Sequence, residues 1–355
     1  MFLLTPFFMI FYFWLLDNLK IKKDLLSYLI PFLLYIFVAG LQYEVGTDYN
    51  SYIDIYSSDY RLSTYFDKGE IGFYYLFNFL KWFDLHYQSL FFAFSIVNGF
   101  MFFCLIDRLK EEGCNIVLFL FLFFVVTNIY QNQLNGLRQF VGVLSLPLFL
   151  HYIFSKSYFK SLLVLFLAVS FHLSAIIFSV FYFLKLLNIY VKNLFFYFVF
   201  SFFFYYLFDY IFPFILGFID QSYLFYFEYD FESNLVAVLS KLYYLPGVIL
   251  FYYLYGRELY RNSFTDSKYF KFCVFIFTVT YWSFILIYNY PIFGRLFYYF
   301  SFFYVFPFYY VLFILKSHKN MMAFYFTLVY LALPYILKVT LFAKSEFLYK
   351  SFIFN

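Results

Sequence analysis

Long runs without a charged side chain divide this sequence, and they constrain its fold more than any other feature. A transmembrane helix needs about 20 mostly apolar residues to cross a hydrocarbon layer of about 30 Å. A membrane β-barrel would show shorter segments of alternating polarity, whereas these runs are apolar on every face. The sequence therefore predicts an all-α, polytopic bundle of transmembrane helices. The runs cover residues 1–16, 25–43, 87–106, 115–137, 139–155, 161–184, 193–208, 242–256, 272–294, 296–315 and 320–337.

Composition excludes the main alternatives. Hydrophobic residues make up 65% of the chain and charged residues only 12%, which is too few to cover a water-soluble domain of this size. The mean hydropathy of +0.80 excludes a disordered chain, a coiled coil and a nucleic-acid-binding domain. Three cysteines without paired spacing predict neither a disulfide framework nor a metal knuckle.

The distribution of charges sets the expected orientation, because short loops rich in Lys and Arg stay on the cytoplasmic side. Two acidic loops, at about residues 42–86 and 217–240, are predicted to lie outside. Residues 1–16 are interpreted as a first span with its N-terminus outside, since the nearest lysines follow this segment. The basic loops assigned to the cytoplasm are residues 20–23, 108–110, 156–160, 257–271 and 316–319.

This orientation is consistent only if two apolar segments do not cross the membrane. Residues 71–83 are too short to span and are predicted to form an interfacial or re-entrant helix. Residues 161–184 have lysines on both sides, so we expect two half-helices that meet near His172 and dip in from the cytoplasmic face. The prediction is about ten spans in a single integral membrane domain, residues 1–355.

Two arginines break apolar runs at the predicted outer surface, Arg138 and Arg295. Each could be an anchor that reaches toward the lipid headgroups, but the positive-inside rule disfavours such anchors on the outer side. Pro291 and Gly294 are expected to break the helix, which leaves backbone groups beside Arg295 available to a ligand. The planar guanidinium of an arginine matches the geometry of phosphate oxygens. We interpret the pair as a site for phosphate or pyrophosphate.

Other candidate site residues lie in the first outer loop and at His172. A histidine deep in an apolar run can be a hydrogen-bonded core residue, but its place at the predicted helix break favours function. Carboxylates among tyrosines can bind sugar hydroxyls while the rings stack on the sugar, although a solvated acidic loop is the alternative. The catalytic candidates are Asp48, Glu70 and His172, and the sugar-binding candidates are Tyr49, Tyr52, Asn135 and Gln139.

Common catalytic signatures are missing from the sequence. It contains no phosphate-binding P-loop, no Gly-x-Ser-x-Gly elbow, no His-Glu-x-x-His and no Cys-x-x-Cys. We therefore expect no cofactor, and we expect any catalysis to proceed without a metal.

Five short motifs, in order from about residue 42 to residue 300, resemble the EpsG branch of the Wzy-type oligosaccharide repeat-unit polymerases. One position departs from the family, which often has an arginine where this chain has Gln42. If that arginine binds phosphate in the family, this chain relies on Arg138 and Arg295 or recruits Arg61. The motifs are Val45-Gly46-Thr47-Asp48-Tyr49 with Tyr52, Glu70-Ile71-Gly72-Phe73, Asn135-Gly136-Leu137-Arg138-Gln139, Phe171-His172-Leu173-Ser174-Ala175, and Gly294-Arg295 followed by residues 298–300.

The resemblance implies a glycosyltransferase of the bacterial inner membrane, with its active site facing the periplasm or the cell exterior. It would polymerise undecaprenyl-pyrophosphate-linked oligosaccharides into O-antigen, capsule or exopolysaccharide. Arg138 and Arg295 would stabilise the pyrophosphate leaving group, and His172, Asp48 or Glu70 would be the base. A membrane protein that regulates chain length is a candidate partner, and no nucleic acid is expected. The alternatives are an O-antigen ligase and a lipid-linked oligosaccharide flippase.

Overall fold

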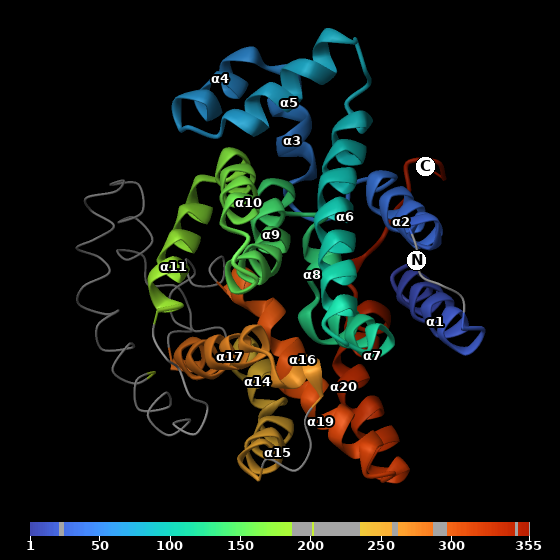
Figure 1. Cartoon of the computed structure of the whole chain (residues 1–355). Coiled ribbons are helices and arrows are strands. Elements are labelled where there is room, and N and C mark those ends of the chain that lie inside the picture. Colours follow the sequence, from blue (N-terminus) through green and yellow to red (C-terminus); the bar gives the residue numbers. More distant parts are fainter. Residues whose placement is uncertain are drawn as a thin grey trace. The chain divides into compact units, whose positions relative to one another are not determined.

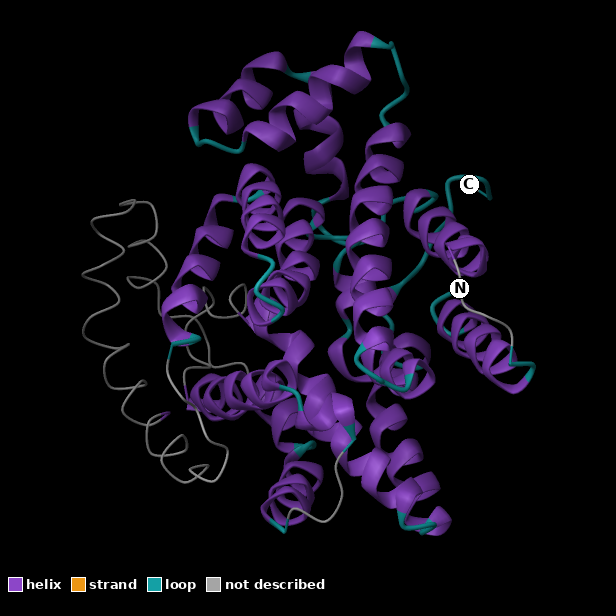
Figure 2. Cartoon of the chain, viewed as in Figure 1, coloured by secondary structure: helices purple, strands orange, loops and turns teal. Residues whose placement is uncertain are grey.

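A computed structural model describes residues 1–20, 25–186, 201, 235–257, 262–286, 297–344 and 347–354. Figure 2 shows that these residues form helices joined by short loops, without a strand in the described part of the chain. One isolated bridge pairs Gln42 with Ser351. The all-helical class expected from the apolar runs is therefore confirmed for the described residues.

The chain groups into two compact units. Unit 1 contains residues 1–187 and 329–355, and unit 2 contains residues 188–328. The helices of unit 1 are α1 (Leu4–Asn18), α2 (Leu25–Gly40), α3 (Tyr49–Ser57), α4 (Asp59–Asp67), α5 (Ile71–Trp82), α6 (Gln88–Glu111), α7 (Ile116–Leu122), η1 (Phe123–Thr127), α8 (Ile129–Asn132), α9 (Leu137–Phe154), α10 (Tyr158–Phe171), η2 (Leu173–Ser179), α11 (Val180–Leu184) and the later part of α20 (Met321–Thr340).

Two long apolar helices organise unit 1. The 24-residue α6 and the 18-residue α9 pack together, α2 covers α6, and α10 covers α9. Helices α3, α4 and α5 form a separate layer, which Figure 1 shows beyond the ends of α6, α9 and α10. This layer corresponds to the predicted first outer loop. Its apolar side chains, including Leu62, Phe73 and Phe77, form a buried cluster together with residues of α6, α9 and α10.

The helix break predicted near His172 is present in the structure. Helix α10 ends at Phe171, and His172 has extended backbone angles (φ −152°, ψ 109°) before η2 begins. The chain then reverses direction. As a result, the hydroxyl of Ser161 near the start of α10 lies 2.7 Å from the hydroxyl of Tyr182 in α11. The two segments form a hairpin with His172 at its tip.

The sequence pattern predicted one continuous helix over residues 115–137, but the structure shows an interrupted one. Helix α7 and the π-helical turn η1 end at Asn128, which adopts a left-handed conformation (φ 55°). Thr127 contributes to the break, because its hydroxyl donates to the carbonyl of Phe123 and accepts the N–H of Ile129. Side chains thus replace helical backbone bonds, as polar residues near helix ends commonly do.

Unit 2 is built around aromatic rings. The ring of Tyr304 packs against Phe277, Tyr281 and Phe297 at centroid distances of 5.1, 5.8 and 5.8 Å. Helices α15 and α17 both contact α19. The described helices of unit 2 are α14 (Leu235–Leu242), α15 (Leu245–Gly256), α16 (Ser263–Asp266), α17 (Lys268–Leu286), η5 (Phe302–Tyr304), α19 (Val305–Ser317) and the first part of α20.

Four of the described helices are long and apolar enough to cross a membrane. This indicates a membrane protein, whereas the count of ten spans and the dip of the hairpin into the bilayer stay predictions. The predicted run at residues 193–208 and most of the loop at 217–240 lie outside the described residues. The four segments are Gln88–Glu111, Leu137–Phe154, Phe297–Ser317 and Met321–Thr340.

Candidate functional site

Glu70, Arg138 and His172 come together in unit 1, although each lies on a different element. Glu70 precedes α5, Arg138 lies in the first turn of α9, and His172 forms the tip of the α10–η2 hairpin. One carboxylate oxygen of Glu70 pairs with Nη1 of Arg138, and the other lies 3.0 Å from Nδ1 of His172. We call these three residues the charged cluster.

A glycine brings α5 close enough to α10 for this contact. A Cβ atom on Gly72 would lie 2.4 Å from the hydroxyl oxygen of Ser170, next to the tip of the hairpin. A larger residue at position 72 would therefore require the side chains of Ser170 and Phe171 to shift, beside the contact between Glu70 and His172. Figure 1 shows α5 lying across the end of α10 that leads into this tip.

Glu70 is held as a carboxylate. Its side chain is 6% exposed, and burial by itself disfavours the charged form. The hydrogen bond with His172, the charge of Arg138 and the N–H of Leu173 outweigh burial and lower the pKa of Glu70. Glu70 is therefore ionised at neutral pH and is a weak base.

The carboxylate of Glu70 sets the tautomer of His172. An ionised carboxylate only accepts hydrogen bonds, so Nδ1 of His172 carries the proton that it donates to Glu70. In the neutral form of the ring, Nε2 is then the nitrogen that can accept a proton. The His172 side chain is 23% exposed, so a hydroxyl group can approach it. This arrangement is suited to general base catalysis.

Arg138 lies between the carboxylate and an aromatic layer. Its guanidinium carbon is 4.4 Å from the ring centroid of Tyr65 and 5.2 Å from that of Phe73, which are cation–π distances. Nε of Arg138 is buried and makes no hydrogen bond within the described ranges. Arg138 is therefore held in place by a carboxylate and two aromatic rings.

Asp48 and Asn135 meet in a second contact between the outer loop and the chain before α9. The side-chain oxygen of Asn135 accepts the N–H of Asp48 at 2.8 Å and the hydroxyl of Thr47 at 3.4 Å. Asp48 itself is exposed at the start of α3. Asn135, predicted to contact sugar, thus uses its oxygen to hold the turn that presents Asp48.

The predicted sugar-binding tyrosines are buried. Tyr49 is 2% exposed and stacks on Phe91 at a centroid distance of 4.6 Å. Tyr52 is 6% exposed, and burial raises the pKa of its hydroxyl while the charge of Arg138 opposes that rise. Both rings belong to the core of the outer layer, and their contact with sugar stays a prediction from the sequence. Gln139, the fourth candidate, is partly buried in the first turn of α9.

Two further positions qualify the sequence predictions. Arg295 lies outside the described residues, so its pairing with Arg138 stays a prediction. Gln42, which replaces an arginine common in the resembled family, is fully buried and bonds through its carbonyl to the side chain of Gln88. The sequence reasoning missed Tyr65, because no local signal distinguishes it from the many other tyrosines.

Replacing Gly46 with alanine is expected to destabilise the turn that carries Asp48. Gly46 has φ +80°, and a Cβ there would lie 2.4 to 2.8 Å from three side-chain atoms of Asn135. Gly69 has φ +81° with nothing within 4 Å, so Gly69→Ala carries only the backbone cost of about 1–2 kcal/mol. In purified protein, Gly46→Ala should lower the melting temperature clearly more than Gly69→Ala. Equal melting temperatures for the two variants would contradict this contact.

Comparison with known proteins identifies one match. The sequence model of the EpsG family matches residues 25–352. Neither the curated proteins nor the solved structures contain a match.

Proposed function

Because this chain belongs to the EpsG family, whose members are associated with polymerase-like roles in polysaccharide synthesis, we propose that it is an oligosaccharide repeat-unit polymerase. It joins repeat units carried on undecaprenyl pyrophosphate into an O-antigen, capsule or exopolysaccharide. The observation that carries this proposal is the charged cluster, in which the carboxylate of Glu70 holds the guanidinium of Arg138 through one oxygen and the imidazole of His172 through the other.

The proposed reaction is a glycosyl transfer without a metal. His172 Nε2 takes the proton of an acceptor hydroxyl, and the acceptor oxygen bonds to the anomeric carbon of the donor glycan. The bond from that carbon to the phosphate oxygen breaks, and the pyrophosphate leaves with the electron pair. Glu70 stabilises the imidazolium that forms, as an orienting carboxylate does in other base-catalysed sites.

The charge balance of the cluster suits a pyrophosphate leaving group. Before reaction, the charges of the Glu70 carboxylate and the Arg138 guanidinium cancel, and the proposed step starts from the neutral imidazole of His172. After proton transfer the cluster carries one positive charge, at the moment when the pyrophosphate gains negative charge. Arg138 provides hydrogen-bond donors to this group in a largely buried setting, where such interactions are strong. Arg295 is proposed as a second pyrophosphate ligand on sequence grounds alone.

The hairpin supports an active site on the outer side of the membrane. Its 14-residue first arm is about 21 Å long at 1.5 Å per residue, about two thirds of the hydrocarbon thickness. At its open end, Lys185 donates to the carbonyl of Ile153 and to the hydroxyl of Tyr158. With this basic end in the cytoplasm, His172 points toward the outer layer that carries Glu70. We propose this orientation in the bacterial cytoplasmic membrane, with a chain-length regulator as partner.

Deletion of the gene tests the proposal against its alternatives. A polymerase deletion should leave surface glycan with a single repeat unit, and the wild-type gene should restore the ladder of chain lengths on a gel. Free polymer that is not joined to its final lipid would instead indicate a ligase. Repeat units retained on the cytoplasmic face would indicate a flippase.

A further inference from the structure

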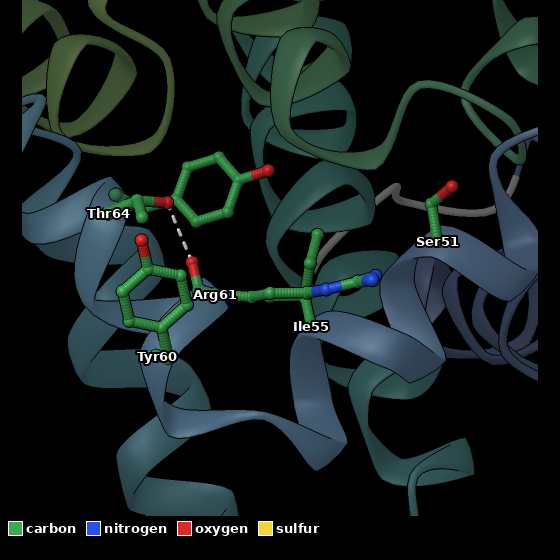
Figure 3. Close-up of a pocket in the computed structure, with 6 residues that line it drawn as sticks. Ser51, Ile55, Tyr60, Arg61 and Thr64 are labelled. Carbon is green, nitrogen blue, oxygen red and sulfur yellow. Dashed lines mark hydrogen bonds between the residues drawn. The ribbon is translucent and has the colours of Figure 1, made fainter.

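A pocket opens between α3 and α4, apart from the three residues of the charged cluster. Its volume is about 260 Å³, and its lining comes from both helices. Figure 3 shows Arg61 extending from α4 toward Ile55 and Ser51 of α3, with Tyr60 and Thr64 lining the other side. The pocket is smaller than the roughly 300–1,000 Å³ of sites for drug-sized ligands, so it suits a single ring.

The charges in and beside the pocket favour an uncharged ligand. Nη1 of Arg61 lies 3.0 Å from a carboxylate oxygen of Asp54, so the positive charge is already compensated. Both side chains are more than half exposed, at 58% and 60%, so both partners are accessible to a ligand. The pair therefore offers donors and acceptors side by side, which matches neighbouring hydroxyls of a sugar better than an anion.

The other lining groups also suit a sugar ring. Tyr60 is 81% exposed, so an aromatic face is available to stack on the apolar face of a pyranose. The hydroxyl of Thr64 donates to the carbonyl of Arg61 at 2.7 Å, which leaves its lone pairs to accept. Ser51 supplies a second hydroxyl on the opposite helix.

Tyr65 joins the pocket to the charged cluster. It lines the pocket, and its ring packs on the guanidinium of Arg138. A ring bound in the pocket would thus be separated from Arg138 by one aromatic side chain. The pocket thus lies close to the charged cluster without containing any of its residues, as a subsite for a sugar other than the reacting one requires.

We propose that the pocket formed by Ser51, Ile55, Tyr60, Arg61, Thr64 and Tyr65 is an acceptor subsite that binds one uncharged pyranose ring of the repeat unit. This inference rests on the proposed function, since it assumes that the acceptor is an oligosaccharide. The subsite contributes binding energy and fixes the position of the acceptor oligosaccharide relative to the charged cluster. It takes no part in proton transfer. Substitutions here should therefore raise KM for the acceptor and leave kcat close to that of the wild type.

Binding of free oligosaccharide tests the subsite without any turnover. The probe is the repeat unit released by mild acid from lipid-linked intermediates of the deletion strain, and the readout is saturation-transfer NMR on full-length protein in nanodiscs. We expect Tyr60→Ala to weaken binding about three- to tenfold, and Arg61→Gln to act in the same direction. Tyr75→Ala is the matched control, because Tyr75 is also exposed, at 60%, but lies on α5 outside the pocket.

Two results would overturn the subsite. One is equal binding by wild type, Tyr60→Ala and Arg61→Gln. The other is displacement of the probe by inorganic pyrophosphate in wild type but not in Arg61→Gln, which would make the pocket an anion site. Failure of the polymerase proposal looks different, because the deletion strain would then keep its full ladder of chain lengths whatever the pocket variants bind.

Discussion

Replacing His172 with asparagine is expected to reduce polymer formation by about 10²- to 10⁴-fold, the usual contribution of a general base. The asparagine amide can still donate to Glu70, as Nδ1 of His172 does at 3.0 Å, but it has no basic nitrogen. The measurement is the rate of chain extension by purified protein on lipid-linked repeat units, with the ladder of surface glycan as the cellular readout.

The control for this prediction is His318→Asn, at an exposed histidine that follows α19 in unit 2. It should keep wild-type activity, and both variants should reach the membrane in equal amounts. An active His172→Asn enzyme would show that His172 only supports the structure. The base would then be sought at Asp48, whose carboxylate is exposed on the turn held by Asn135.

Replacing Arg138 with lysine is expected to lower kcat by about 10²- to 10³-fold, as loss of a group that stabilises transition-state charge does. Lysine keeps a positive charge beside Glu70 but loses the planar fork of a guanidinium that binds phosphate oxygens. The protein should therefore stay folded while the rate of chain extension falls. A normal rate for Arg138→Lys would exclude a specific role in binding the leaving group.

The variant Arg138→Ala distinguishes the contribution of Arg138 to stability from its contribution to catalysis. It leaves the buried carboxylate of Glu70 without its cationic partner, at a cost of about 3–5 kcal/mol in stability. The double variant Arg138→Ala with Glu70→Gln removes that buried charge, so it should recover thermal stability without recovering activity. Recovery of both would contradict the role of Arg138 in transfer.

The lowered pKa of Glu70 gives these stability measurements a pH dependence of known sign. A carboxyl group whose pKa is lower in the folded state stabilises the protein above its unfolded pKa, which is about 4.3 for glutamate. The stabilisation is lost as pH falls through the lower folded value. Comparisons of stability among the Arg138 variants therefore belong near neutral pH, where Glu70 contributes fully.

The sequence pointed to the members of the charged cluster one at a time. Arg138 and His172 were recognisable because a charged or titratable group inside an apolar run is costly and needs a reason. Glu70 was recognisable by its place at the end of an acidic loop. Their grouping was not predictable, because Glu70 is separated from Arg138 by 68 residues and from His172 by 102.

Packing also changed the meaning of several motif residues. Tyr49 lies in a sugar-binding pattern by sequence but forms core with Phe91, because an aromatic ring serves equally well for either purpose. Asn135, which the sequence predicts to contact sugar, also holds a turn whose Gly46 leaves no room for a side chain. The apolar run at residues 115–137 was expected to be one helix, since hydropathy does not register the left-handed Asn128.

The sequence by itself determined that this is a helical membrane protein, which family it belongs to, and which few polar residues need an explanation. These conclusions follow from the free energy of transferring each segment from water to lipid and from the order of the motifs, and both depend on the linear sequence alone. Only the tertiary structure decided which polar groups become partners. A contact such as Gly72 against Ser170 depends on the approach of two helices, and this approach orients Glu70 toward His172 and so defines which ring nitrogen is the base.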